Sequence, residues 1–290
     1  MGKPRIAFCF SGQARTLDQT YPFIKSNIID AAKEQGFDYD VFCAVEDDED
    51  CYKVNLLNPT NVEKIKSTEV EQIIIDRFWK DQERLSNYTF MKRLPQNPNM
   101  LLWYLQQVYK FTKSIKMANN QNKEYDLVVR LRFDFYFFNK LNYKNIIEAT
   151  RGKSIICNDT LFIRKFTIIT DFFFVWNQKT MTILSEIFDN FLIGFKWWEH
   201  NRIIYNIFNS IRRLIFYFNK TVIKKWIIPV TPIWFMESRF NTIFTPEYHC
   251  YKYLCNNGVR IIKEYFSLVL LRKNIENSRV SLNKKTKYEI

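Results

Sequence analysis

"RIAFCFSGQART", residues 5–16, joins a short apolar run to a polar turn. The apolar part is rich in strand-forming residues. The turn leads into a segment where Ile24, Ile28 and Ala32 recur with helical spacing, and Gly36 marks its end. The stretch therefore predicts a strand, a tight turn and a helix in succession, which is the repeating unit of an α/β fold.

The same alternation continues along the chain. A second strand is expected at 39–45, a third within 125–137 ("YDLVVRLRFDFYF"), and helical spacing recurs over 61–80 and 100–117. Such alternation implies a parallel sheet that is covered by helices on both faces. Later elements are expected as short strands at 153–158, 159–164 and 171–176, and as helices at 178–193 and 198–215. We expect one domain over 1–275 and a basic, unpacked tail over 276–290.

Composition limits the class of protein. The chain has 290 residues, is 47% hydrophobic and carries a formal charge of +13, which suits a globular protein with an anionic partner. Nucleic acid, an acidic membrane surface or a phosphorylated small molecule would each fit. The abundance of Ile, Asn, Lys, Phe and Tyr is also typical of an AT-rich genome, which offers a second origin for the charge.

Cysteines and apolar runs indicate the compartment. Six cysteines form no CxxC pair, which favours a reducing environment, and "HCYKYLC" at 249–255 lacks the fourth ligand of a zinc site. No signal peptide is recognisable, and no run reaches the roughly 18 uncharged apolar residues of a membrane span. We expect a cytoplasmic protein, soluble or peripheral on the cytoplasmic face of a membrane.

The turn "SGQART" is the first candidate site, because open α/β sheets bind ligands beyond the carboxyl ends of their strands. Gly12 is one of only six glycines, and it suits a sharp turn or the close approach of a ligand. Gln13 and Arg15 follow it, and Arg15 lies near a helix start where it could meet a phosphate. The alternative is a structural turn with a solvated arginine.

Three charges inside an apolar stretch form the second candidate. Arg130, Arg132 and Asp134 alternate, so a continuous strand would place them on one face. An isolated buried charge costs several kcal/mol, so we expect them at the end of the strand, beside a ligand. The alternative is an internal salt-bridge cluster.

These stretches together resemble the WavE-like glycosyltransferases of lipopolysaccharide synthesis. The resemblance covers residues 4–210 through "IAFCFSGQART", "YDVF", "YDLVVRLRFD", "ITDFFFVWNQKTM" and "EHNRIIYNIF". It implies a GT-A-like fold, a mixed, mostly parallel sheet flanked by helices, and a sugar donor that is a nucleotide diphosphate. It also implies a glycan or lipid-linked acceptor.

The resemblance also implies roles for the site residues. In GT-A enzymes an Asp-x-Asp motif holds a divalent metal on the diphosphate, and the matching place here is Arg132-Phe133-Asp134. Asp134 would hold Mn²⁺ or Mg²⁺, with Gly12, Gln13, Arg15, Arg130 and Arg132 binding the donor. Alternatively, the two arginines of "RLR" neutralise the diphosphate directly and make the metal optional.

An inverting transfer also needs a base for the acceptor hydroxyl. Asp171 and Glu199 are the candidates, although Glu199 could instead interact with its helix N-terminus. Trp197 and Trp198 could stack on a sugar or a base, or belong to the core. His200 could line the site or lie on the surface.

The rival hypothesis is a non-catalytic basic module that binds nucleic acid or an anionic membrane. It would explain the net charge and the aromatic residues by phosphate contacts and base stacking. It does not explain why charges lie at the end of a strand beside a glycine turn, and no nucleic-acid-binding motif is present. We therefore expect a nucleotide-sugar enzyme without a nucleic acid partner.

Overall fold

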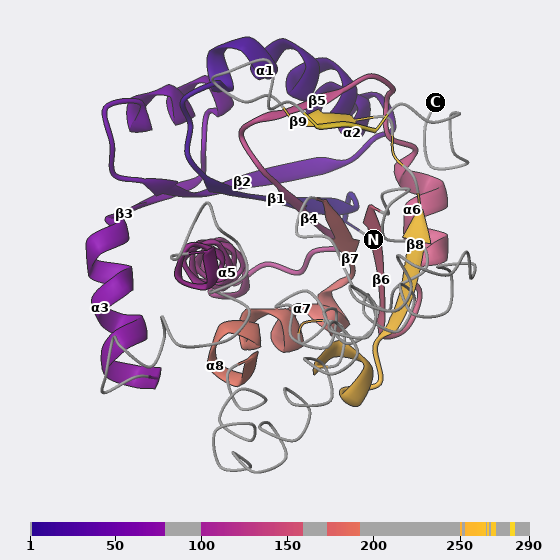
Figure 1. Cartoon of the computed structure of the whole chain (residues 1–290). Helices are drawn as coiled ribbons and strands as arrows, with labels where there is room; N and C mark the ends of the chain where they lie inside the picture. Colours follow the sequence, from indigo (N-terminus) through magenta and orange to yellow (C-terminus); the bar gives the residue numbers. More distant parts are fainter. Residues whose placement is uncertain are drawn as a thin grey trace, which may run out of the picture.

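The computed structural model shows an α/β fold in which helices cover both faces of a seven-stranded sheet (Figure 1). It describes residues 2–78, 100–158, 173–191, 250, 253–264, 266, 268–270 and 279–281. The strands of the large sheet are β1 (Arg5–Gly12), β2 (Asp38–Glu46), β3 (Asn61–Ile65), β4 (Leu127–Leu131), β6 (Ser154–Asn158), β7 (Phe174–Trp176) and β8 (Arg260–Glu264).

The strand order is β3-β2-β1-β4-β7-β6-β8. Strands β1, β2, β3 and β4 run parallel to one another, and β7 runs antiparallel to both of its neighbours, β4 and β6. The last pair, β6 and β8, is parallel again. The expected mixed, mostly parallel sheet flanked by helices is confirmed.

A second, antiparallel sheet of three strands lies beside α1 (Figure 1). Its strands are β5 (Phe135–Phe137), β9 (Leu268–Leu270) and β10 (Arg279–Ser281). The helical elements are α1 (Leu17–Ile24), the π-helical turn η1 (Lys25–Ile29), α2 (Asp30–Glu34), the 3₁₀ segment η2 (Cys51–Leu57), α3 (Ser67–Phe78), α5 (Met100–Asn119), α6 (Tyr143–Ala149), α7 (Gln178–Ser185) and α8 (Ile187–Phe191).

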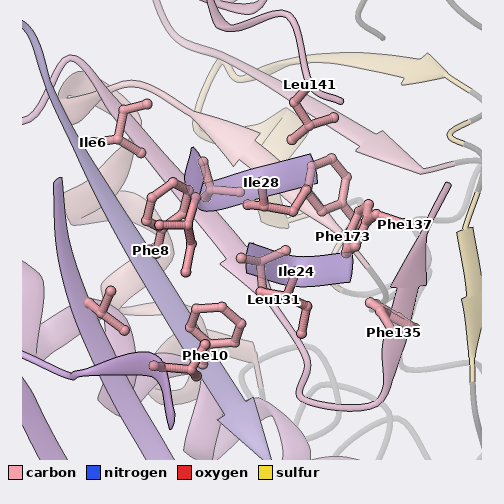
Figure 2. Close-up of a cluster of buried hydrophobic side chains, with 14 of the residues drawn as sticks. Ile6, Phe8, Phe10, Ile24, Ile28, Leu131, Phe135, Phe137, Leu141 and Phe173 are labelled. Carbon is pink, nitrogen blue, oxygen red and sulfur yellow. The ribbon is translucent and has the colours of Figure 1, made fainter. Parts of the chain in front are cut away.

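Alternation along β1 divides the core between the two faces of the sheet. Ile6, Phe8 and Phe10 point toward α1 and η1, where they pack with Ile24 and Ile28 (Figure 2). Full burial of each such side chain contributes about 1.5–3 kcal/mol. This face holds the β1–α1 unit that the sequence predicted.

The opposite face packs against α5. Ala7 and Cys9 of β1 point this way, and their small side chains leave room for Val108, Phe111 and Ile115 of the helix. Burial raises the pKa of the Cys9 thiol, so this cysteine is an inert part of the core. Helix α5 therefore lies across β1 and β2, and this packing fixes the position of its polar side chains.

An ion network closes the amino-terminal edge of the sheet. The carboxylate of Asp40 in β2 accepts hydrogen bonds from Arg5, Lys123 and Tyr125 at 3.0 Å each. Burial acts to raise the pKa of Asp40, but the bonds from Lys123, Arg5 and Tyr125 outweigh it, and the pKa lies below its usual value. This network ties β1, β2 and the start of β4 together.

The structure corrects one sequence expectation about secondary structure. Residues 61–65 form strand β3 rather than the start of a helix, because their backbone pairs with β2 from Phe42 to Glu46. Helix α3 then buries Val70 and Ile74, while Ile73 is exposed. Within the expected tail, Arg279–Ser281 pairs with β9 and is part of a sheet.

No helix in the described part of the chain is both long enough and apolar enough to span a bilayer. The expected strand at 159–164 and the expected helix at 198–215 lie outside the described residues.

Candidate functional site

The carboxyl ends of β1 and β4 meet at one edge of the sheet. In the parallel register, Cys9 lies opposite Arg130 and Phe10 opposite Leu131. Gly12 therefore ends β1 at the same level as the turn that follows β4. This is the edge at which parallel α/β sheets bind their ligands.

The β1–α1 turn is tight, and its backbone requires glycine. Gly12 has a φ of +123°, a conformation that side-chain-bearing residues rarely adopt. The turn closes where the Leu17 amide donates to the Ala14 carbonyl at 2.9 Å. Gln13 and Arg15, both predicted donor-binding residues, are half-buried in this turn.

Lys53 of η2 stabilises the β1–α1 turn through a hydrogen bond to its backbone. Its ammonium donates to the Arg15 carbonyl at 2.9 Å and pairs with Asp50 and Asp18 at 3.0 and 3.3 Å. Burial acts to lower the pKa of Lys53, but the two carboxylates outweigh it and raise the pKa above its usual value. A charged lysine thus fixes the position of the Arg15 backbone.

Arg130 is almost fully buried, with 1% of its surface exposed, at the end of β4. Its guanidinium lies 5.2 Å from the ring centre of Phe111 in α5 and 5.8 Å from that of Phe174 in β7. Cation–π contact of this kind stabilises a buried cation, and the planar group stacks where an ammonium would not. Arg130 therefore faces α5.

Arg132 and Asp134 form a bidentate ion pair just past the end of β4. The Nε and Nη2 atoms of Arg132 donate to the two carboxylate oxygens of Asp134 at 2.9 and 2.8 Å. Their side chains are 12% and 8% exposed. The Arg132 guanidinium also lies 5.8 Å from the Phe135 ring centre.

Phe133 anchors this turn on the other face of the sheet. Its ring stacks on Phe10 with centroids 5.6 Å apart, and its carbonyl accepts a hydrogen bond from the Thr20 hydroxyl of α1. The backbone between Arg132 and Asp134 is therefore held by both β1 and α1.

The two-residue period predicted that the three charges share one strand face. In the structure they do not. Strand β4 ends at Leu131, and residues 133–134 form a turn before β5 begins in the second sheet. Arg130 packs against α5, whereas Arg132 and Asp134 follow the strand and pair with each other. Arg132 and Asp134 lie just past the end of β4 and form the internal ion pair that was the alternative, whereas Arg130 lies within β4.

Glu46, at the carboxyl end of β2, belongs to a buried cluster that the sequence analysis missed. Its carboxylate accepts from the Ser67 amide and hydroxyl at 2.9 and 2.8 Å, and it pairs with the ammonium of Lys110 in α5. It thereby satisfies the amino terminus of α3. The available signals were a serine before a helical segment and a lysine on the buried face of α5.

The donor set around Asp134 does not fit a divalent cation in the described part of the chain. Both Asp134 oxygens already accept from Arg132, and no three metal-ligating side chains cluster among the described residues. Divalent Mg²⁺ or Mn²⁺ requires several oxygen ligands.

Several predicted site residues lie outside the described residues. These are the candidate bases Asp171 and Glu199, together with Trp197, Trp198 and His200. Strand pairing places the Gly12 end of β1 beside the end of β4, which carries Arg130 and is followed by Arg132 and Asp134.

Residues 1–161, more than half of the chain, match the model of the family described as "Domain of unknown function (DUF7796)". The chain belongs to this family. The DUF7796 match contains both strand ends of the site and stops before Asp171 and Glu199. No curated protein matches the sequence.

Three solved structures similar to the DUF7796 chain are glycosyltransferases by their descriptions. Mouse xyloside xylosyltransferase 1, in the apo form, has a TM-score of 0.40 at 8% identity, over 91% of this chain and 85% of that one. The apo bifunctional glycosyltransferase WbbM scores 0.34 at 13% identity, over 66% and 35%. The glycosyltransferase GlyE of Streptococcus pneumoniae TIGR4 scores 0.31 at 13% identity, over 69% and 40%. At these scores and identities, the matches say nothing about the substrate or reaction of this chain.

Proposed function

We propose that this DUF7796 protein is a glycosyltransferase that moves a sugar from a nucleotide-diphosphate sugar to a hydroxyl of a glycan or lipid-linked acceptor. One observation carries the proposal. Two arginines, Arg130 and Arg132, lie at the carboxyl end of β4, directly beside the Gly12 turn at the end of β1. The sequence resemblance to WavE-like glycosyltransferases implies a donor-binding role for the same residues.

The chemistry of sugar transfer needs cations at this place. The bond between the anomeric carbon and the diphosphate oxygen breaks, and its electron pair stays on the diphosphate, which becomes more negative as it leaves. Guanidinium groups bind phosphate oxygens bidentately and keep their charge at any physiological pH. Arg130 and Arg132 would hold the departing group and stabilise that charge.

The acceptor side of the reaction completes the balance. A bond forms between the acceptor oxygen and the anomeric carbon, and the hydroxyl proton passes to a carboxylate base. We assign this role to Asp171 or Glu199, as the sequence predicts.

We infer that the two arginines neutralise the diphosphate, the role that the resemblance assigns to a metal. Asp134 then orients Arg132 through their bidentate pair rather than holding Mn²⁺ or Mg²⁺. A metal-dependent enzyme would require Asp134 to release Arg132 when the cation binds. Donor binding with and without Mn²⁺ distinguishes the two arrangements.

The function can be tested by thermal stabilisation of the purified chain. UDP, GDP, CMP and dTDP are compared with and without Mn²⁺, and in parallel with a single-stranded oligonucleotide over a range of salt concentrations. Stabilisation by one nucleotide supports the proposal, because a ligand that binds only the folded state raises the melting temperature. Oligonucleotide binding with a steep salt dependence and no nucleotide effect would favour the basic module instead.

A second measurement identifies the donor. Many glycosyltransferases hydrolyse their donor slowly when the acceptor is absent, so a panel of nucleotide sugars can be screened for release of the nucleoside diphosphate. The nucleotide that stabilises the fold should be the one whose sugar conjugate is hydrolysed. Hydrolysis of none of the panel, together with no stabilisation by any nucleotide, would refute the proposed function.

A further inference from the structure

Two buried polar atoms without hydrogen-bond partners lie where the end of β1 packs against α5. They are the hydroxyl of Ser11 and the amide oxygen Oε1 of Gln107, and neither has a partner among the described residues. Leaving a buried polar group unsatisfied costs about 1–3 kcal/mol. Such a group in a native protein calls for an explanation, and a ligand is one.

The two atoms lie around Gly12. Ser11, which is 1% exposed, precedes Gly12 and follows Ala7 and Cys9 on the strand face that packs on α5. A side chain added at Gly12 would meet one atom within 4 Å, namely Oε1 of Gln107 at 3.8 Å. A Cβ atom at Gly12 would thus be in van der Waals contact with the unsatisfied amide, so this glycine lies next to Gln107.

Gln107 also lies on the same side of α5 as Phe111, the residue that Arg130 contacts. Phe111, whose ring underlies the Arg130 guanidinium, is four residues further along α5, which is about one helical turn. The neutral pair of Ser11 and Gln107 is thus next to the cationic end of β4. One ligand could reach both places.

The chemistry of the two atoms limits what that part of the ligand can be. An amide oxygen only accepts hydrogen bonds, so its partner must present an N–H or O–H group. A phosphate at neutral pH presents acceptors, so it could accept a hydrogen bond from the Ser11 hydroxyl but could not donate one to Oε1 of Gln107. The matching part of a nucleotide sugar is its nucleoside, through a base N–H or a ribose hydroxyl.

We propose that Ser11 and Gln107 form the subsite that receives the nucleoside of the donor, and that Gln107 determines which nucleotide is preferred. This inference rests on the proposed function, because the arginines must hold the diphosphate for the nucleoside to extend from β4 toward β1. Gly12 lets the nucleoside approach the backbone closely.

The test compares dissociation constants for UDP, GDP, CDP, ADP and inorganic pyrophosphate in the wild type and in Gln107→Met. Methionine keeps the length of the side chain and removes the acceptor. We expect the preferred nucleoside diphosphate to bind at least tenfold more weakly, with pyrophosphate affinity changed by less than twofold. Gln107→Asn, which keeps an amide but shortens its reach, should lose less affinity.

Gln121→Met is the matched control. Gln121 is also a half-buried glutamine, it follows the other end of α5, and its amide donates to the Met117 carbonyl at 3.3 Å. This control should bind every probe as the wild type does. The melting temperature of each variant without ligand reports whether it folds.

The 2′-deoxy form of the preferred nucleotide separates the two possible sources of the N–H or O–H group. If Gln107 accepts from the ribose, Gln107→Met should lose its effect on the deoxynucleotide; if it accepts from the base, the effect persists. Either result supports the subsite. Nucleotide affinity that is unchanged in Gln107→Met, or lost equally for pyrophosphate, would overturn the subsite alone, whereas a wild type that binds no probe would overturn the proposed function as well.

Discussion

Arg132 holds both carboxylate oxygens of Asp134, at 2.9 and 2.8 Å, across a turn of two residues at the edge of the central sheet. The Nε and Nη2 edge of the Arg132 guanidinium is thus occupied by Asp134, and this fixes the orientation of the group. In the proposed function the pair would have two roles that mutation can separate, namely stabilisation of the turn and orientation of a cation toward a phosphate.

The first prediction separates these roles. Arg132→Met should lower affinity for the preferred nucleoside diphosphate at least tenfold, because it removes a cation and leaves the Asp134 carboxylate unpaired. Asp134→Asn should lower nucleotide affinity less than tenfold without Mn²⁺, because it removes a negative charge and keeps an oxygen acceptor for Arg132. Isothermal titration with and without Mn²⁺ measures both.

If Asp134 instead holds a metal, Asp134→Asn would abolish a Mn²⁺-dependent increase in affinity that the wild type displays. Stability supplies the control for folding. Removal of one partner from a buried pair costs about 3–5 kcal/mol, so Asp134→Ala should lower the free energy of unfolding by about 3 kcal/mol. Chemical denaturation measures that loss.

The second prediction concerns Arg130, whose guanidinium packs on Phe111 and Phe174. Arg130→Met should reduce affinity for pyrophosphate and for nucleoside diphosphates by a similar factor, at least tenfold, because it removes charge that acts on the phosphates. Arg260→Met is the matched control, since Arg260 starts β8 and donates to the Ala149 carbonyl at 3.0 Å. Loss of nucleotide affinity with pyrophosphate affinity intact would contradict the assignment.

The third prediction is a loss of stability in acid that depends on Asp40. The folded-state pKa of Asp40 is lowered, so its ionised form stabilises the fold above the unfolded pKa of about 3.9, and this contribution disappears as the pH falls through the folded value. Asp40→Asn should therefore lower the free energy of unfolding at pH 7 by about 2 kcal/mol, the scale of a hydrogen bond to a charged group. The difference from wild type should shrink below about pH 4.

Asp38→Asn is the comparison for this experiment. Asp38 is 44% exposed and its ion pairs with Lys3 and Arg5 are 3.8 Å long, whereas the Asp40 side chain is 9% exposed. Exposed pairs contribute about 0–1 kcal/mol. Equal losses in the two variants would mean that the network around Asp40 is not specific.

The fourth prediction has the opposite sign and concerns Asp48. Burial raises the pKa of Asp48, and the nearby carboxylates of Asp50, Glu46 and Glu49 add to the shift, against a hydrogen bond from the Asp50 amide. Its ionised form therefore destabilises the fold. Asp48→Asn keeps the acceptor and removes the charge, so it should raise the melting temperature at pH 7 by roughly 2 °C.

That gain should diminish as the pH falls through the raised pKa of Asp48, because the wild-type carboxyl then becomes neutral as well. Thermal melts at several pH values from 7 down to 4 measure the trend. A gain that is constant over this range would indicate an effect of packing rather than of charge.

Much of the fold could be predicted from local patterns. Apolar runs located β1, β2, β6 and β7, helical spacing located α1 and α5, and the position of Arg132 and Asp134 after β4 followed from the cost of burying charge. Side-chain periodicity did not reveal the boundary between β4 and β5, because both are strands with the same two-residue period. Arg130, Arg132 and Asp134 alternate with apolar residues, yet the chain turns after Leu131. Phe135–Phe137 then pairs with β9, more than 130 residues later in the sequence.

The sequence by itself determined many of the strands and helices, because side-chain periodicity is a local property of the chain. Only the tertiary structure decided which charges meet. Lys110 reaches Glu46 from 64 residues away, Arg130 lies on Phe111 of a preceding helix, and Gln107 faces Gly12 across 95 positions. Such contacts depend on strand order and helix placement, which come from the packing of the whole core and leave no mark in the spacing of neighbouring residues.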